Sequence, residues 1–184
     1  AMKIIAKDVV HKADVGGIAL NVGSAQDVRA AFERMMGDED ERAAREETRV
    51  MVQRMAPQGQ EIILGAQRDA QFGPLLIVGM GGRYVEVFQD VAFRLAPLNQ
   101  VDAIAMIEET AAGRIMKGIR GAPPRDIQQV AETLCRVGQL VSDFPCISEL
   151  DVNPLIVRNE GEGAWAVDVR IAIDGAPTSS ASDS

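Results

Sequence analysis

Apolar residues recur at helical spacing in three stretches of the chain. The first spans 25–36, where Ser24 is a good N-cap, Gly37 is a good stop and the apolar side chains fall along one side. The same spacing runs through 99–112 and through 125–143, the latter after two prolines. We therefore predict three helices, and we expect the second and third to cover one face of a sheet.

Short apolar runs separated by turn residues indicate strands between the first two helices. Runs at 50–52 and 62–64 flank a turn signal at 56–59, and they predict a strand, a turn and a strand. A continuous apolar run at 74–80 predicts a further strand, and strand-like texture continues over 84–97. No internal repeat is recognisable.

The C-terminal third has the pattern of a hairpin. One apolar strand covers 147–157, a polar turn follows, and a second strand begins at 164. In the first strand Asp151 and Asn153 alternate with apolar residues, so both polar side chains should lie on one face. Pairing of the two strands should bring Asp168 towards Asn153.

Composition places the chain among globular proteins. Its 184 residues suit one domain or one domain with an appendage, and 47% of them are hydrophobic and 25% charged. No apolar run reaches the ~20 residues of a membrane-spanning helix. With only five Phe, one Tyr and one Trp, the core must be built from aliphatic side chains and eight Met. Such a core favours helices layered on a sheet.

Net charge and cysteine spacing argue against some classes of ligand and metal site. The formal net charge of −8 argues against sequence-independent binding of duplex nucleic acid, whereas a small anionic ligand stays compatible with it. Cys135 and Cys146 lack the spacing of a zinc site, and we interpret both as reduced packing thiols. No leader sequence is recognisable, so the expected compartment is the cytoplasm. We expect the charged segment 38–47 to be solvated and the small, polar tail 175–184 to be disordered.

The predicted hairpin gathers three oxygen-bearing side chains. Asp151, Asn153 and Asp168 are the ligand type that Mg²⁺ requires beside nucleotide phosphates. The alternative is a pair of strands with one polar, solvent-facing side. Spacing alone favours this alternative, because any half-exposed strand alternates in this way.

A second group with candidate chemistry lies near the N-terminus. His11 is the only histidine and precedes Gly16 and Gly17. Glycine permits close backbone approach to phosphate oxygens and imidazole can accept a phosphoryl group, but a hydrogen-bonded loop histidine in front of a tight turn fits the same residues. The glycines do not have the spacing of a Walker or dinucleotide-binding loop. Lys3 is either an exposed strand end or a buried charge seeking a phosphate, and the spacing favours a strand end.

Seven motifs follow one another along the chain: HKADVGGI (11–18), VQRM (52–55), RDAQFGP (68–74), GGRYVEV with Asp90 after it (81–87), FRLAPL (93–98), KGIRG (117–121) and ELDVNPL (149–155). In this order they resemble the ATP-grasp portion of the nucleoside-diphosphate-forming acyl-CoA synthetases, whose best-known members are the ADP-forming acetate–CoA ligases. The resemblance extends from Lys3 to about Ile173.

The resemblance implies an ATP-grasp fold of the α+β class, in which two subdomains hold a nucleotide between their sheets. It implies that 3–48 is the remainder of a first subdomain incomplete on its N-terminal side, and that 49–173 is the second subdomain. We expect residues 1–2 to be a cloning remnant in front of an internal start.

The resemblance also implies a nucleotide site. Lys3 is similar to a strand lysine that contacts ATP phosphates, and Glu61 matches an acid that faces the ribose. The stretch 51–55 is similar to the hinge whose backbone reads adenine. Nucleotide binding is therefore assigned to Met51, Gln53 and Met55, in addition to Gly16 and Gly17. The expected cofactors are ATP or ADP with Mg²⁺.

The catalytic assignments rest on the same resemblance. Asn153 and Asp168 match magnesium ligands, and Asp151 matches an acid that lies against a phosphorylated histidine in the related succinate–CoA ligases. His11 stands where a second histidine relays a phosphoryl group from the CoA-binding module to ADP.

The family resemblance implies partners outside this chain. CoA binds a separate CoA-binding module, which with the ligase modules belongs to the same polypeptide or to a partner subunit, and the full-length protein is expected to be an oligomer. We expect a fragment that does not catalyse the full reaction alone. The alternative function is a regulatory ATP-grasp module of a protein lysine acetyltransferase. The sequence leaves open the carboxylic acid and the choice between ADP and GDP.

Overall fold

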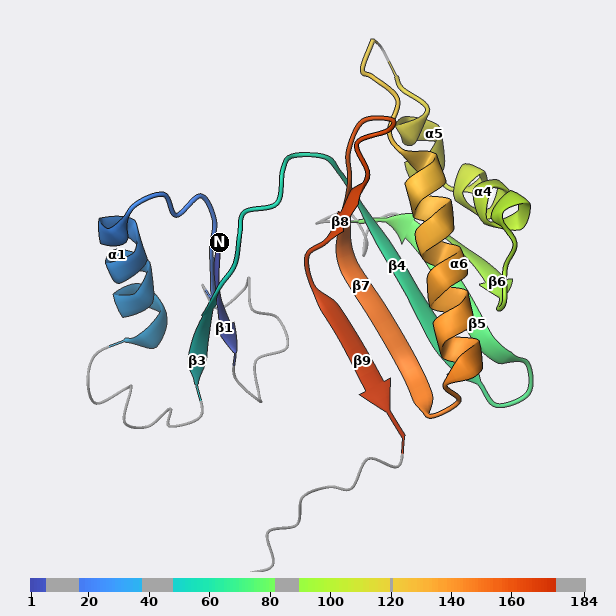
Figure 1. Cartoon of the computed structure of the whole chain (residues 1–184), viewed down its shortest axis with the longest axis horizontal. Coiled ribbons are helices and arrows are strands. Elements are labelled where there is room, and N and C mark those ends of the chain that lie inside the picture. The colour runs from blue at the N-terminus through green and yellow to red at the C-terminus, as the bar shows by residue number, and fades with distance from the viewer. Residues whose placement is uncertain (6–16, 38–47, 82–89, 120, 175–184) are drawn as a thin grey trace, which may run out of the picture. The chain divides into compact units, whose positions relative to one another are not determined.

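Two sheets, the first with one helix and the second with three, make up the described part of the chain (Figure 1). The computed structural model describes residues 1–5, 17–37, 48–81, 90–119 and 121–174. The chain divides into two units, Ala1–Met55 and Ala56–Ser184. The division follows Met55 rather than residue 48, because the strand that starts at Arg49 pairs within the first unit.

The first unit is a small antiparallel sheet with one helix. The strand order is β2-β1-β3, and β1 pairs with both neighbours. Its elements are β1 (Met2–Ile5), β2 (Ile18–Ala19), α1 (Ala25–Met36) and β3 (Arg49–Val52). A small core unites the sheet with α1, from which Ala31 and Met35 are buried against Met2 and Ile4.

Helix α1 confirms the helix predicted over 25–36. The Ser24 side chain accepts a hydrogen bond from the backbone N–H of Asp27 at 3.1 Å, so one of the free amides of the first turn is satisfied. At the other end Gly37 takes a φ of 73°, a conformation that glycine adopts without steric cost, and the helix stops there.

The second unit is built on a six-stranded antiparallel sheet. Its path is β6-β5-β4-β7-β8, with β9 paired to another part of β7. The strands are β4 (Gln60–Asp69), β5 (Gly73–Met80), β6 (Val91–Leu95), β7 (Ile147–Val157), β8 (Ala164–Ala166) and β9 (Val169–Ile173). The strands predicted over 62–64 and 74–80 are confirmed. The part of 84–97 before Asp90 lies outside the described residues.

Three helices cover one face of this sheet: α4 (Gln100–Glu109), α5 (Ala111–Met116) and α6 (Ile127–Asp143). The helix predicted over 99–112 is divided at Thr110, whose backbone is extended and ends α4. The Thr110 hydroxyl then accepts a hydrogen bond from the N–H of Gly113 at 2.9 Å and caps α5. The helix predicted over 125–143 is confirmed as α6.

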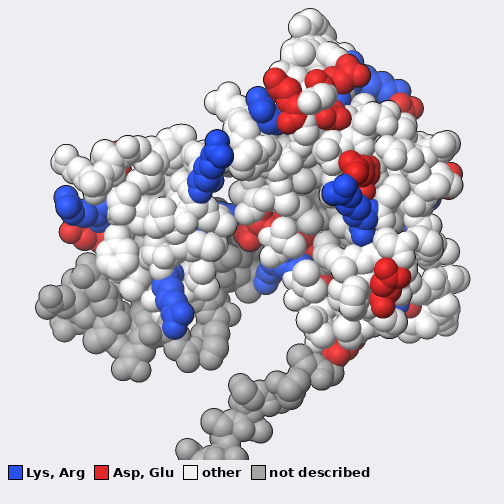
Figure 2. All heavy atoms as spheres, in the orientation of Figure 1, with Lys and Arg blue, Asp and Glu red and all other residues white. Residues whose placement is uncertain are grey.

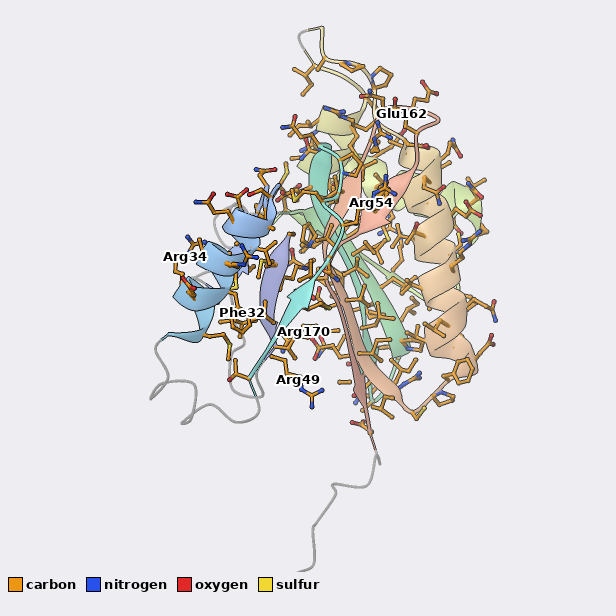
Figure 3. The ribbon with its side chains drawn as sticks, turned by 60° about the vertical axis from the view of Figure 1, so that its left-hand side comes forward. Phe32, Arg34, Arg49, Arg54, Glu162 and Arg170 are labelled. Atoms are coloured by element: carbon orange, nitrogen blue, oxygen red, sulfur yellow. The ribbon has the colours of Figure 1, made fainter. Side chains whose placement is uncertain are left out.

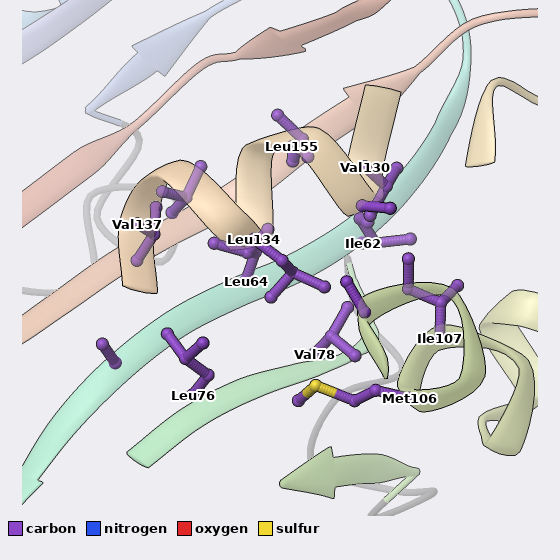
Figure 4. Close-up of a cluster of buried hydrophobic side chains, with 14 of the residues drawn as sticks. Ile62, Leu64, Leu76, Val78, Met106, Ile107, Val130, Leu134, Val137 and Leu155 are labelled. Atoms are coloured by element: carbon purple, nitrogen blue, oxygen red, sulfur yellow. The ribbon is translucent and has the colours of Figure 1, made fainter. Parts of the chain in front are cut away.

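The core of the second unit lies between these helices and the sheet (Figure 4). Alternate residues of the strands point towards the helices, and their side chains are fully buried at Ile62, Leu64 and Leu76. Helix α6 buries Val130 and Leu134 against them. The prediction that the second and third helices cover a sheet face is therefore confirmed.

The opposite face of the sheet, which we name the open face, carries no helix among the described residues of the second unit. Residues of β4 between the buried ones lie on it, among them Glu61, Ile63, Gly65 and Gln67. This face holds the candidate site described below.

Cys146 is exposed, so its interpretation as a packing thiol is wrong; it lies in the short connection between α6 and β7. Within the described residues, no helix combines the length and hydropathy that a transmembrane segment needs.

Candidate functional site

The last three strands form the predicted hairpin. β7 pairs first with β8 and then with β9 in one register, and the turn between β7 and β8 is closed by the Arg158 N–H, which donates to the Gly163 carbonyl at 3.0 Å. In the middle of the hairpin the N–H of Asn153 donates to the carbonyl of Asp168 at 3.0 Å. The hairpin therefore brings Asp168 beside Asn153, as its pattern predicts.

A β-bulge changes the direction of the β7 backbone at Asn153. Between the paired residues Ile62 and Leu64, β4 has the single residue Ile63, whereas β7 has two residues between their partners, Asn153 and Pro154. This two-against-one arrangement interrupts the alternation along β7, and such bulges are frequent beside active sites. As a result Asn153 is exposed, while the next apolar residue of β7 returns to the core.

The polar residues before the bulge lie on the open face. Leu150 and Val152 of β7 are buried, whereas Glu149 is exposed and Asp151 is half-buried. Asp151 pairs across the sheet with Gly65 of β4. Because Gly65 has no side chain, a hollow of about 170 Å³ lies here, lined on this face by Ile63, Gly65, Gln67, Ile77, Glu149 and Asp151.

Charge and burial act together on Asp151. Its pKa is raised above the ordinary value, first because partial burial disfavours the ionised carboxylate and then because Glu149 is a nearby negative charge. Asp168 raises the pKa further, whereas Arg170 lowers it. All four charged groups therefore share one electrostatic environment.

Arg170 and Glu149 are members of this cluster that the sequence did not single out. Arg170 is the direct partner of Asp151 across the β7–β9 pair, and Glu149 precedes Asp151 by two residues on the same strand. The alternation of polar and apolar residues reveals Glu149. Arg170 can be assigned to the cluster only when the hairpin register is known, because every residue of its own strand β9 is exposed and shows no alternation of burial.

Asn153 and Asp168 offer the donor set that Mg²⁺ prefers. Within the described ranges, no three or more His, Cys, Asp and Glu side chains form a closed metal site. Mg²⁺ in nucleotide sites is held by one or two carboxylates together with phosphates and water, so an exposed amide oxygen next to one carboxylate fits the ion when a nucleotide supplies other ligands.

The other predicted site residues are distributed over both units. Glu61 lies on the open face of β4, exposed, and pairs with Ile156 of β7. His11 and Gly16 lie outside the described residues, whereas the carbonyl of Gly17 accepts a hydrogen bond from Ile4 at 2.8 Å.

Three residues of the predicted adenine hinge belong to the first unit. Met51 pairs with Lys3 across β1 and β3. The backbone N–H and C=O of Gln53 both bond to Ala1, at 2.9 Å each, and Met55 is exposed. Their role in adenine binding stays a prediction.

Lys3 is buried, which contradicts the prediction of an exposed strand end. It is only 4% exposed and lies in β1, the middle strand of the first sheet, where it pairs with Ile18 on one side and Met51 on the other. The isolated pattern of the first residues could not reveal this burial, because it arises from two strands that are distant in sequence.

Acidic and basic side chains are interspersed on the molecular surface in Figure 2, without a large basic patch on the side in view. Figure 3 shows basic residues on separate elements, among them Arg34 on α1 and Arg170 on β9.

A profile described as an ATP-grasp domain matches residues 1–173. The chain belongs to the ATP-grasp family. The predicted family and fold are thereby confirmed.

Curated relatives with similar sequences are acid–CoA ligases. The chain is 43% identical to acetate–CoA ligase [ADP-forming] I of Archaeoglobus fulgidus over 94% of its own length and 25% of the relative's. It is 38% identical to the beta subunit of acetate–CoA ligase [ADP-forming] I of Pyrococcus furiosus, over 94% of its own length and 74% of that subunit. The chain thus spans a quarter of one ligase and about three quarters of a subunit of another.

Solved structures of an ATP-grasp relative agree with the fold. The dinucleotide-forming acetyl-coenzyme A synthetase 1 of Ca. Korarchaeum cryptofilum, in complex with coenzyme A and Ca-AMPCP, matches with a TM-score of 0.83 at 39% identity, over 94% of this chain and 75% of that one. A second structure, with Mg-AMPPCP and a phosphohistidine segment pointing towards the nucleotide binding site, matches with a TM-score of 0.78 at 39% identity, over 94% and 76%.

Proposed function

We propose that this chain is the nucleotide-binding phosphoryl-transfer module of an ADP-forming acid–CoA ligase. The observation that carries the proposal is the pairing of Asn153 with Asp168 beside Asp151, on the open face of an ATP-grasp sheet. The ligase names of the sequence relatives and the nucleotide analogues in the similar solved structures support it.

The proposed reaction moves one phosphoryl group twice. Acyl-CoA and phosphate give CoA and an acyl phosphate on a CoA-binding module. An imidazole nitrogen attacks the phosphorus, the bond to the acyl oxygen breaks, and the free carboxylate leaves. His11 receives the group from the histidine of that module, and its N–P bond then breaks as a β-phosphate oxygen of ADP attacks, which gives ATP. In reverse, ATP drives thioester formation.

The residues of the hairpin divide the binding tasks. Asn153 and Asp168 would hold the Mg²⁺ of the nucleotide, and this ion supplies positive charge that the transferring phosphoryl group needs. Asp151 accepts a hydrogen bond from the imidazole that carries the phosphoryl group and so orients the ring. The half-buried position of Asp151 beside the hollow above Gly65 suits this task, because the ring has room to approach.

The proposal includes partners for the full-length protein. A CoA-binding module, in the same polypeptide or on another subunit, carries the acyl chemistry. The word subunit in the name of the Pyrococcus furiosus relative supports a division of the ligase between chains.

Labelling with ATP tests the proposal. The full-length protein is incubated with ATP labelled on its terminal phosphate and Mg²⁺, and acid-labile, base-stable label is sought on His11. We expect label on the wild type and on the control variant Asp143→Asn, which alters an exposed residue at the end of α6, and loss of the label in His11→Ala. Full labelling of His11→Ala would contradict the relay. Nucleotide binding without any label in the wild type would favour the regulatory alternative.

A further inference from the structure

We propose that Arg170 is a positioning residue for phosphoryl transfer, which offsets the negative charge around the Asp151 carboxylate and orients that carboxylate when the phosphoryl group is bound. The inference rests on the proposed function and adds a residue to it. Arg170 lies on β9, where Figure 3 labels it.

The first argument is register. Arg170 and Asp151 are direct partners across the antiparallel β7–β9 pair, so their side chains leave the sheet on the same face. Asp151 is in turn the direct partner of Gly65 on β4. Gly65, Asp151 and Arg170 therefore form one row across the open face, with the hollow above Gly65 at one end of the row and the guanidinium at the other.

The second argument is charge. Two carboxylates, those of Glu149 and Asp168, act on the Asp151 carboxylate, and Arg170 is the cation that acts on Asp151 against them. A polyphosphate that approaches three carboxylates is repelled unless cations are present. The ion held by Asn153 and Asp168 would balance part of this charge, and Arg170 balances part on the other side of Asp151.

The third argument is the chemistry of the side chain. A guanidinium presents its N–H groups in a planar fork that matches either a carboxylate or a phosphate, so one arginine can hold Asp151 and meet a phosphoryl oxygen as the group moves. The Arg170 side chain is exposed, and within the described ranges it forms no side-chain hydrogen bond or ion pair; its backbone pairs with β7. It is therefore not committed to a purely structural contact.

Variants of the full-length protein separate transfer from binding. In Arg170→Met we expect the single-turnover rate of histidine labelling to fall by about tenfold or more, while the dissociation constant for Mg-ATP changes by less than about threefold. Arg170→Lys should recover part of the rate, because it restores the charge without the fork. The matched control is Arg136→Met, an exposed arginine of α6 in the helical layer, and it should label at the wild-type rate.

A double-mutant cycle tests whether Arg170 acts through Asp151. We expect Arg170→Met to slow Asp151→Asn much less than it slows the wild type, since the two residues act as a pair. A wild-type labelling rate in Arg170→Met would overturn the assignment of Arg170. Rate losses that simply multiply in the double variant would do the same, and both results would leave the proposed function standing. Absence of label in the wild type would overturn the proposed function, and the Arg170 assignment with it.

Discussion

The N–H of Asn153 donates to the carbonyl of Asp168 at 3.0 Å, so the two proposed magnesium ligands lie side by side on neighbouring strands. The bond uses only backbone atoms. Replacement of either side chain should therefore leave the pairing of β7 with β8 and β9 intact, which makes both residues suitable for tests of ligand binding without loss of the fold.

Gly65→Ala is expected to disturb the site through the backbone. A Cβ at this position would lie 2.7 Å from the carbonyl oxygen of Leu150, the residue before Asp151, so β7 has to shift. We expect a loss of about 1–3 kcal/mol in the free energy of unfolding, and weaker binding of Mg-ATP. Denaturant unfolding and nucleotide titration measure the two effects.

The control for this variant is Gly23→Ala. There the added Cβ meets its nearest neighbours at 4.0 Å, which is ordinary contact. If Gly65→Ala were as stable and bound nucleotide as tightly as Gly23→Ala, the close approach of β4 and β7 would not matter for the site.

Leu134→Ala should strongly destabilise the second unit. Leu134 of α6 has no exposed surface and packs in the core beneath the sheet, so its truncation leaves a cavity. The expected cost is about 2–5 kcal/mol, measured by denaturant unfolding. Val101→Ala on α4, where Val101 is 76% exposed, should change stability by less than about 0.5 kcal/mol. Similar losses for both variants would count against this core.

Ser24→Ala should loosen α1. The variant removes the hydroxyl that accepts the Asp27 N–H, and N-caps of this kind contribute about 1 kcal/mol. Hydrogen exchange of the α1 amides measures the effect, and faster exchange is expected. Gln26→Ala, an exposed neighbour within the helix, is the control and should not accelerate exchange. Unchanged protection in Ser24→Ala would show that the cap is dispensable.

The turn between β4 and β5 should give a pH-dependent contribution to stability. The N–H groups of Phe72 and Gln71 donate to the Asp69 carboxylate at 2.8 and 2.7 Å, and they lower the pKa of that carboxyl below its ordinary 3.8. A depressed pKa means that the folded state binds the proton less readily than the unfolded chain. The contribution is therefore present above pH 3.8 and is lost as the pH falls through the folded-state pKa.

Asp69→Asn isolates this effect, because asparagine does not titrate. The difference in unfolding free energy between the wild type and Asp69→Asn should be largest near neutral pH and should shrink in acid. A difference that stays constant from neutral pH into acid would contradict the role of the carboxylate.

The local signals of the sequence predict much of the fold. Ser24 and Gly37 delimit α1 because a cap and a stop act within a few residues. The alternation of Asp151 and Asn153 with apolar residues, followed by a polar turn, predicts the hairpin and the approach of Asp168 for the same reason.

Features that depend on distant segments could not be predicted in this way. The burial of Lys3 follows from pairing with β2 and β3. The bulge at Asn153 follows from the register against β4, and the place of Arg170 beside Asp151 follows from the register against β9. In each case the deciding contact is with another strand, whereas the periodicity of a sequence gives information about one strand at a time.

The affinity of the full-length protein for Mg-ATP, measured by titration of Asn153→Ala and Asp168→Ala, tests the central claim most directly. We expect each variant to bind about tenfold more weakly or worse, with unfolding midpoints close to that of the wild type and with unchanged binding in Asp143→Asn. Wild-type affinity in both variants, at saturating and at limiting Mg²⁺, would contradict the assignment of this hairpin as the site that holds the metal-bound nucleotide.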